Sequence, residues 1–127
     1  MPKFKPKILI VDDEAQGREA LAQTLRGRGY EVLEAATGKE VLSRAKSEWP
    51  TLIILDVILP DIPGTKVLEQ LRADPIAKAI PVLLLTAKPD VVGELSGLSG
   101  KSDRFAEKPG RMEDLLKTVH EMVTGTQ

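Results

Sequence analysis

The sequence contains no cysteine, which excludes disulfide bonds, thiolate nucleophiles and cysteine-ligated zinc. Its single histidine, His120, excludes metal sites built from several imidazoles. One Trp, one Tyr and two Phe are too few aromatic residues for a surface on which RNA bases stack. An excess of one charge is also lacking, because 18 Lys and Arg residues stand against 19 Asp and Glu residues. This balance excludes nucleic-acid binding through bulk positive charge.

Long hydrophobic runs are missing as well. The longest apolar stretches, such as 52–55 and 82–85, have four or five residues, and a membrane span needs about 20. At the amino terminus only residues 8–11 form an apolar run, which is too short for a secretion signal. We therefore expect a cytoplasmic protein that neither enters the membrane nor binds nucleic acid directly.

The length of 127 residues predicts a single domain, residues 1–127, with its core between about residues 7 and 123. Short apolar runs alternate with longer stretches of helical periodicity. The runs predict strands at 8–11, 30–35, 52–55, 81–85 and 103–107. The periodic stretches predict helices at 15–26, 39–47, 66–72, 90–98 and 111–123, with Thr37 as a cap of the second helix. This alternation predicts an α/β fold, a doubly wound five-stranded parallel sheet with helices on both faces.

Polar side chains follow the predicted strands where these end. Asp12 and Asp13 follow the first strand, Asp56 the third, Thr86 the fourth and Lys108 the fifth. Each residue alone is compatible with a simple turn, but functional groups of open parallel sheets collect at this edge. Three neighbouring carboxylates stay ionised only with a cation, and oxygen ligands favour Mg²⁺. An aspartate beside a metal and a lysine indicates a phosphoryl acceptor.

Four motifs in a fixed order give this chain a family resemblance. They are ILIVDDE at 8–14, PTLIILDVILP at 50–60 with Gly64, LLLTA at 83–87 and FAEKP at 105–109. Thirty residues separate Asp56 from Thr86, and 22 separate Thr86 from Lys108. In motif order and spacing the chain resembles a response-regulator receiver domain, the phosphoacceptor module of two-component signalling. The resemblance implies the flavodoxin-like strand order 2-1-3-4-5, which alternation alone does not give.

The resemblance also implies roles for the residues of the acidic edge. Asp56 is the implied phosphoacceptor, and a histidine kinase or a histidine phosphotransfer protein is the implied donor. Asp13 would bind Mg²⁺ directly, Asp12 directly or through water, and the Ile58 carbonyl would be a further ligand. Lys108 would pair with a phosphoryl oxygen. The domain would catalyse its own phosphorylation and a slow hydrolysis, without turning over a separate substrate.

A second set of implied roles concerns the response to phosphorylation. Thr86 would donate to the phosphoryl group and draw in the following loop. Phe105 occupies the family's aromatic switch position, although an ordinary core aromatic remains an alternative. The peptide bond before Pro109 is a candidate cis bond. The fourth helix, fifth strand and fifth helix are the family's usual output surface and a possible homodimer interface. Departures from the family pattern at residues 101, 102 and 110 leave the output partner open.

The sequence also allows other interpretations of its function. A receiver-like interaction module that is not phosphorylated would not need the acidic residues and the lysine. A metal-dependent phosphatase usually has an aspartate two residues after its nucleophile, where this chain has Ile58. The segment GLSGKS at 97–102 imitates a phosphate-binding loop but has Leu95 where that motif needs glycine. We expect His120 to be solvated.

Ile58 and Lys88 flank the expected phosphorylation site. We hypothesise that the apolar Ile58 slows hydrolysis of the phosphoryl group.

Overall fold

The structure is a computed structural model, and it describes residues 5–87, 103–108 and 110–125. The expected helix at 90–98, the GLSGKS segment, Lys88 and the peptide bond before Pro109 lie outside these residues.

Five parallel strands form one sheet, in the order β2-β1-β3-β4-β5. Their bounds are β1 (Lys7–Val11), β2 (Glu31–Ala35), β3 (Leu52–Asp56), β4 (Val82–Thr86) and β5 (Arg104–Glu107). The implied order 2-1-3-4-5 is therefore confirmed. Residues of β3 and β4 are all buried, whereas β2 and β5 are partly exposed. The two edge strands are less buried because each has a neighbouring strand on one side only.

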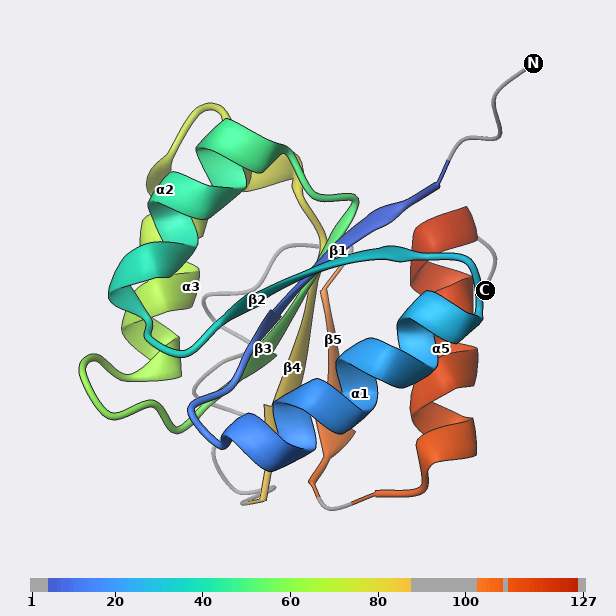
Figure 1. Cartoon of the computed structure of the whole chain (residues 1–127). Coiled ribbons are helices and arrows are strands. Elements are labelled where there is room, and N and C mark those ends of the chain that lie inside the picture. The colour runs from blue at the N-terminus through green and yellow to red at the C-terminus, as the bar shows by residue number, and fades with distance from the viewer. Residues whose placement is uncertain (1–4, 88–102, 109, 126–127) are drawn as a thin grey trace.

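Helices cover both faces of the sheet (Figure 1). The helices α1 (Ala15–Gly27) and α5 (Met112–Thr124) pack on one face, and α2 (Lys39–Glu48) and α3 (Gly64–Ala73) pack on the other. Successive residues of a strand point to opposite faces, so the apolar strands feed two cores. The doubly wound α/β class is thus confirmed. A short 3-10 helix, η1 (Ala77–Ala79), precedes β4 and was not predicted. Among the described helices, none is both long and apolar enough to cross a membrane.

The amino end of α2 differs from the sequence-based expectation. Thr37 does not cap this helix, since the cap position is occupied by Gly38, which has no side chain to accept a hydrogen bond. Instead the Asp61 carboxylate, from the loop after β3, accepts hydrogen bonds from Gly38 N at 2.8 Å and Lys39 N at 2.9 Å. Thr37 Oγ1 donates to Glu40 Oε2 at 2.8 Å. Thr37 N also donates to Glu40 Oε2 at 3.2 Å. The prediction that Thr37 caps the helix was wrong because a distant carboxylate reaches the first N–H groups.

The register of the sheet brings the strand ends together. Val11 pairs with Leu55 across β1 and β3, and Thr86 pairs with Glu107 across β4 and β5. The residues that end or follow these strands therefore lie along one edge of the sheet, which is the edge that the sequence predicts for the site.

Candidate functional site

Lys108 lies at the centre of the candidate site. It directly follows β5, and its Nζ lies 2.8 Å from Asp12 Oδ2 and 2.7 Å from Asp56 Oδ2. The side chains of the two aspartates are only 9% and 10% exposed, and that of Lys108 is 33% exposed. Two carboxylates that are shielded from water repel each other, and the single ammonium group of Lys108 offsets this repulsion.

The second oxygen of each carboxylate is fixed by its own loop. Asp12 Oδ1 accepts a hydrogen bond from Glu14 N at 3.0 Å, and Asp56 Oδ1 accepts one from Ile58 N at 3.1 Å. Both are contacts to the backbone two residues further on, a turn that aspartate side chains commonly form. These turns orient the two carboxylates toward Lys108 and the space beside it.

Gly64 shapes the loop that follows Asp56. Its N–H donates to the Val57 carbonyl at 2.8 Å. A Cβ atom at position 64 would lie 2.6 Å from the backbone of Val57, which no larger residue tolerates without a shift of the chain. The start of α3 can therefore approach the end of β3 closely, and the loop between them is held in a compact form.

Asp13 completes a set of three carboxylates. One oxygen each from Asp12, Asp13 and Asp56 lies within 4.8 Å of the others. Asp12 and Asp56 are buried, whereas Asp13 is exposed. Within the described part of the chain, the Asp13 carboxylate has no hydrogen bond or ion pair. Three hard oxygen donors beside solvent suit a divalent cation that keeps some of its water, as Mg²⁺ does.

The pKa values of the site follow from burial and charge. Burial raises the pKa of Asp56, and the nearby Asp12 charge adds to this, although Lys108 and the Ile58 N–H oppose it. Burial acts to lower the pKa of Lys108, but its hydrogen bonds to Asp12 and Asp56 outweigh this, so the pKa is raised. Lys108 is consequently a cation at neutral pH.

The two residues expected to act as a switch, Thr86 and Phe105, lie at different places relative to the acidic edge. Thr86 is buried at the end of β4, and its carbonyl accepts a hydrogen bond from Lys108 N at 2.8 Å. Phe105 pairs with Leu84 in the sheet, further from this edge, and its partly buried ring packs on the α2–α3 side. Ile58, two residues after Asp56, is 56% exposed. His120 is exposed on α5, as expected.

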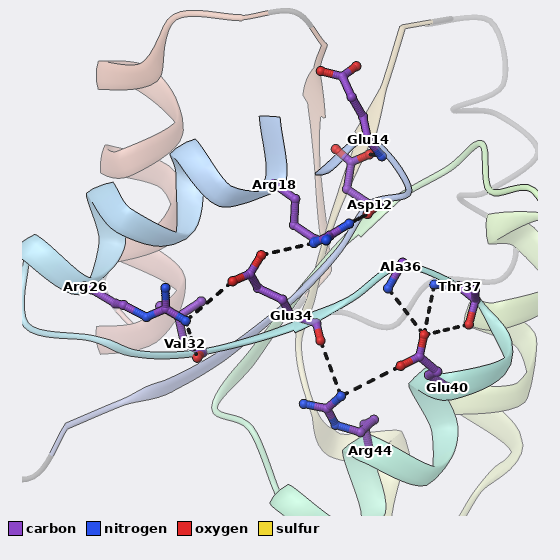
Figure 2. A network of polar contacts seen from close by, with 10 residues as sticks. All are labelled: Asp12, Glu14, Arg18, Arg26, Val32, Glu34, Ala36, Thr37, Glu40 and Arg44. Carbon is purple, nitrogen blue, oxygen red and sulfur yellow. Dashed lines mark hydrogen bonds and ion pairs between the residues drawn. The ribbon is translucent and has the colours of Figure 1, made fainter. Parts of the chain in front are cut away.

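Arg18 contacts this site and pairs with Glu34, and neither residue was predicted from the sequence (Figure 2). Arg18 Nη1 donates to the Asp12 carbonyl at 2.7 Å, and its Nε donates to Glu34 Oε1 at 3.1 Å. A signal was present in the sequence, since Glu34 interrupts a strand that was expected to be apolar. Its partner could not be identified without the tertiary structure.

Comparison with known proteins identifies the family. The sequence profile of the response regulator receiver domain matches residues 8–120. The chain belongs to this family. Receiver domains of response regulators act in two-component signalling, so the fold and the acidic edge belong to a signalling module.

Curated relatives and a solved structure agree with this assignment. The receiver domain is 37% identical over 123 residues to the "Probable transcriptional regulator ycf27" of Cyanophora paradoxa, covering 97% of this chain and 50% of that protein. It is 34% identical over 119 residues to the "DNA-binding response regulator MtrA" of Mycobacterium bovis, covering 94% and 51%. The chain spans about half the length of the curated relatives it matches. Chemotaxis response regulator CheY4 of Vibrio cholerae has a similar structure, with a TM-score of 0.84, 32% identity and coverage of 94% and 99%.

Proposed function

We propose that this receiver domain is a phosphorylation switch in which Asp56 accepts the phosphoryl group. Asp12, Asp13 and Asp56, with the Ile58 carbonyl, would hold Mg²⁺. The donor would be a phosphohistidine of a histidine kinase or of a histidine phosphotransfer protein. The observation that carries the proposal is the contact of Lys108 with Asp12 and Asp56, next to a third carboxylate within 4.8 Å.

The chemistry requires a carboxylate nucleophile and cationic partners for the phosphoryl oxygens. One oxygen of Asp56 forms a bond to phosphorus while the bond from phosphorus to the donor's imidazole nitrogen breaks, and the imidazole leaves with its electron pair. Bound Mg²⁺ would supply positive charge at the transferred oxygens. Lys108 Nζ lies 2.7 Å from Asp56 Oδ2, so the ammonium is close enough to pair with an oxygen of the transferred phosphoryl group. Thr86, at the end of the neighbouring strand, would donate a hydrogen bond from its hydroxyl to another of these oxygens.

Phosphorylation would be read out at the surface of the domain. Movement of Thr86 toward the phosphoryl group would pull on the end of β4, and Phe105 on β5 would repack in response. β5 and α5, the described parts of the expected output surface, would then present a changed surface to an output partner or to a second copy of the chain. Such a switch needs only a population shift between two states that differ by a few kcal/mol.

Mass spectrometry after incubation with acetyl phosphate and Mg²⁺ tests this proposal. We expect the wild-type protein to gain the mass of one phosphoryl group and the Asp56→Asn variant to gain none. No gain by the wild-type protein, or an equal gain by both, would reject the assignment and favour an interaction module that is not phosphorylated. Hydrolysis of small phosphomonoesters with turnover would favour the phosphatase interpretation instead.

A further inference from the structure

Arg18 stands near the start of α1 and reaches back to the acidic site. Its guanidinium makes two contacts, one to the Asp12 carbonyl at 2.7 Å and one to Glu34 Oε1 at 3.1 Å (Figure 2). The Arg18 side chain is 15% exposed and that of Glu34 is 25% exposed. A charged donor of this kind, largely shielded from water, makes a stronger hydrogen bond to a carbonyl than a neutral donor does.

The Asp12 carbonyl belongs to the peptide group that joins Asp12 to Asp13. The other polar groups of Asp12 are held elsewhere, since its N–H donates to the Ala35 carbonyl at 3.1 Å and its Oδ1 accepts from Glu14 N at 3.0 Å. The orientation of the peptide plane between the two aspartates is then set by the contact with Arg18. That plane determines the direction in which the Cα–Cβ bond of Asp13 points.

Asp13 depends on its backbone for its position. Among the described residues its carboxylate has no hydrogen-bond or ion-pair partner, unlike those of Asp12 and Asp56, which contact Lys108. An exposed carboxylate without a partner samples several rotamers, and the backbone decides which of them reach the other two carboxylates.

Glu34 holds the Arg18 guanidinium in place. Its carboxylate lies between two arginines, with Oε1 at 3.1 Å from Arg18 Nε and Oε2 at 3.6 Å from Arg26 Nη2. Arg26 also donates to a strand carbonyl, that of Val32, at 3.1 Å. The two arginines thus make the same kinds of contact, but only Arg18 contacts the turn that carries the acidic site.

We propose that Arg18 is a positioning residue for the metal site: it fixes the peptide between Asp12 and Asp13 so that the Asp13 carboxylate faces the cation. The inference rests on the proposed binding of Mg²⁺ by the three aspartates. It assigns the pair of Arg18 and Glu34 a purpose beyond holding α1 against β2.

The sign of the effect separates positioning from long-range charge. A guanidinium near a cation site repels the cation, so removing either arginine should tighten Mg²⁺ binding if charge alone acts. Positioning predicts the opposite for Arg18, because residues that orient metal ligands typically cost about tenfold or more in metal affinity when removed. Arg26 is the matched control, since its loss removes the same charge and a contact with the same Glu34.

The experiment is a Mg²⁺ titration of the wild-type protein, Arg18→Met and Arg26→Met, followed by amide shifts in NMR spectra. Methionine keeps an unbranched apolar stem but has no donor. We expect the dissociation constant of R18M to rise roughly tenfold and that of R26M to stay within about twofold of wild type or to fall. Without Mg²⁺, the Asp13 amide proton of R18M should shift upfield, because its peptide group has lost the polarising hydrogen bond at the Asp12 carbonyl.

A second variant keeps the proposal testable if R18M does not fold. Arg18→Gln ends at the position of Nε, so it can still contact Glu34, but it lacks the atom that contacts the Asp12 carbonyl. The expected loss of affinity is the same. An Mg²⁺ affinity of R18M or R18Q within twofold of wild type would overturn the positioning role of Arg18. An equal loss of affinity in R26M would overturn it too. Either result would leave the proposed function standing. A wild-type protein that shows no Mg²⁺ binding would overturn the proposed function and this inference with it.

Discussion

Substituting Lys108 with methionine tests the physical basis of the site most directly. The variant removes the ammonium that lies 2.8 Å from Asp12 Oδ2 and 2.7 Å from Asp56 Oδ2. It leaves two carboxylates, each about nine-tenths buried, close together without their cation. We expect K108M to unfold at a lower urea concentration than the wild-type protein, and we expect Mg²⁺ to recover part of this loss.

The size of the loss follows from the two contacts. Hydrogen bonds between charged groups contribute about 1.5–3 kcal/mol each, or about 3–6 kcal/mol for the pair. The Lys108 side chain is 33% exposed, so solvent screens part of this interaction. We therefore expect a loss of about 2–3 kcal/mol, a large part of the roughly 5–15 kcal/mol that stabilises a typical domain.

Mg²⁺ should act in the opposite direction. A ligand at ten times its dissociation constant adds about 1.4 kcal/mol to the free energy of unfolding. In K108M the two carboxylates repel each other more strongly, so we expect Mg²⁺ to bind more tightly and to stabilise this variant more than the wild-type protein. Urea unfolding of both proteins at pH 7, with and without Mg²⁺, measures this difference.

Lys7 provides a matched control at another place in the fold. Its Nζ also lies between two carboxylates, at 3.5 Å from Glu31 Oε2 and 3.3 Å from Glu48 Oε1, and its side chain is 28% exposed. Those carboxylates are 53% and 40% exposed, so K7M should lose less than about 1 kcal/mol and show no added effect of Mg²⁺. A loss in K108M no larger than in K7M, or an equal effect of Mg²⁺ on both, would refute the reasoning.

The pH dependence of the Lys108 contribution has a definite sign. Because the pKa of Lys108 is raised in the folded protein, its contribution is fully present below the unfolded value of about 10.4. It is lost as the pH rises through the folded value. The stability difference between the wild-type protein and K108M should therefore be constant between pH 7 and 9 and shrink above pH about 10.4. A difference that grows in alkaline solution would contradict this assignment.

Four further variants test other residues of the structure. Burial raises the pKa of Asp56, so D56N should be more stable than wild type at pH 7, and the gain should vanish in urea titrations below pH about 3.9, where both side chains are neutral. Arg72 pairs with the Asp103 carboxylate, whose side chain is 0% exposed, so R72M should lose about 3–5 kcal/mol. Arg104 forms a more exposed ion pair with Glu121, so R104M should lose under about 1 kcal/mol of stability. Equal losses in R72M and R104M would show that burial does not decide the cost of breaking an ion pair. Ile58→Asn should lose its phosphoryl group faster than wild type because a polar side chain admits the attacking water, and an equal or slower rate would disprove the hypothesis.

The order of the elements could be predicted from the sequence because each has its own periodicity. Apolar runs that end in aspartate or threonine predicted the central strands, and stretches of helical spacing predicted the helices around them. The edge strands were harder to interpret. Glu34 is partly buried on β2, where it can be held only because the arginines of α1 reach it.

Predictions from the local sequence failed where a residue distant in the chain makes the contact that was expected of a neighbouring one. Thr37 had the type and position of a helix cap, yet Asp61 accepts the hydrogen bonds from the start of α2. The loop after β3 and the start of α2 lie more than 20 residues apart in the chain, and no window of sequence contains both. Only the packing of α2 beside α3 brings them into contact.

The sequence by itself determined which chemistry this protein has available: carboxylates, one lysine and one threonine at strand ends, without cysteine or paired histidines. Parallel strands in register place such ends along one edge, and so these residues could be expected to lie there together. The tertiary structure decided how those groups contact one another. Lys108 between two buried carboxylates, and Arg18 on the carbonyl of Asp12, depend on contacts across the sheet and between a helix and a strand. Hydrogen bonds act only over a few ångströms, so their partners are set by packing and not by spacing along the chain.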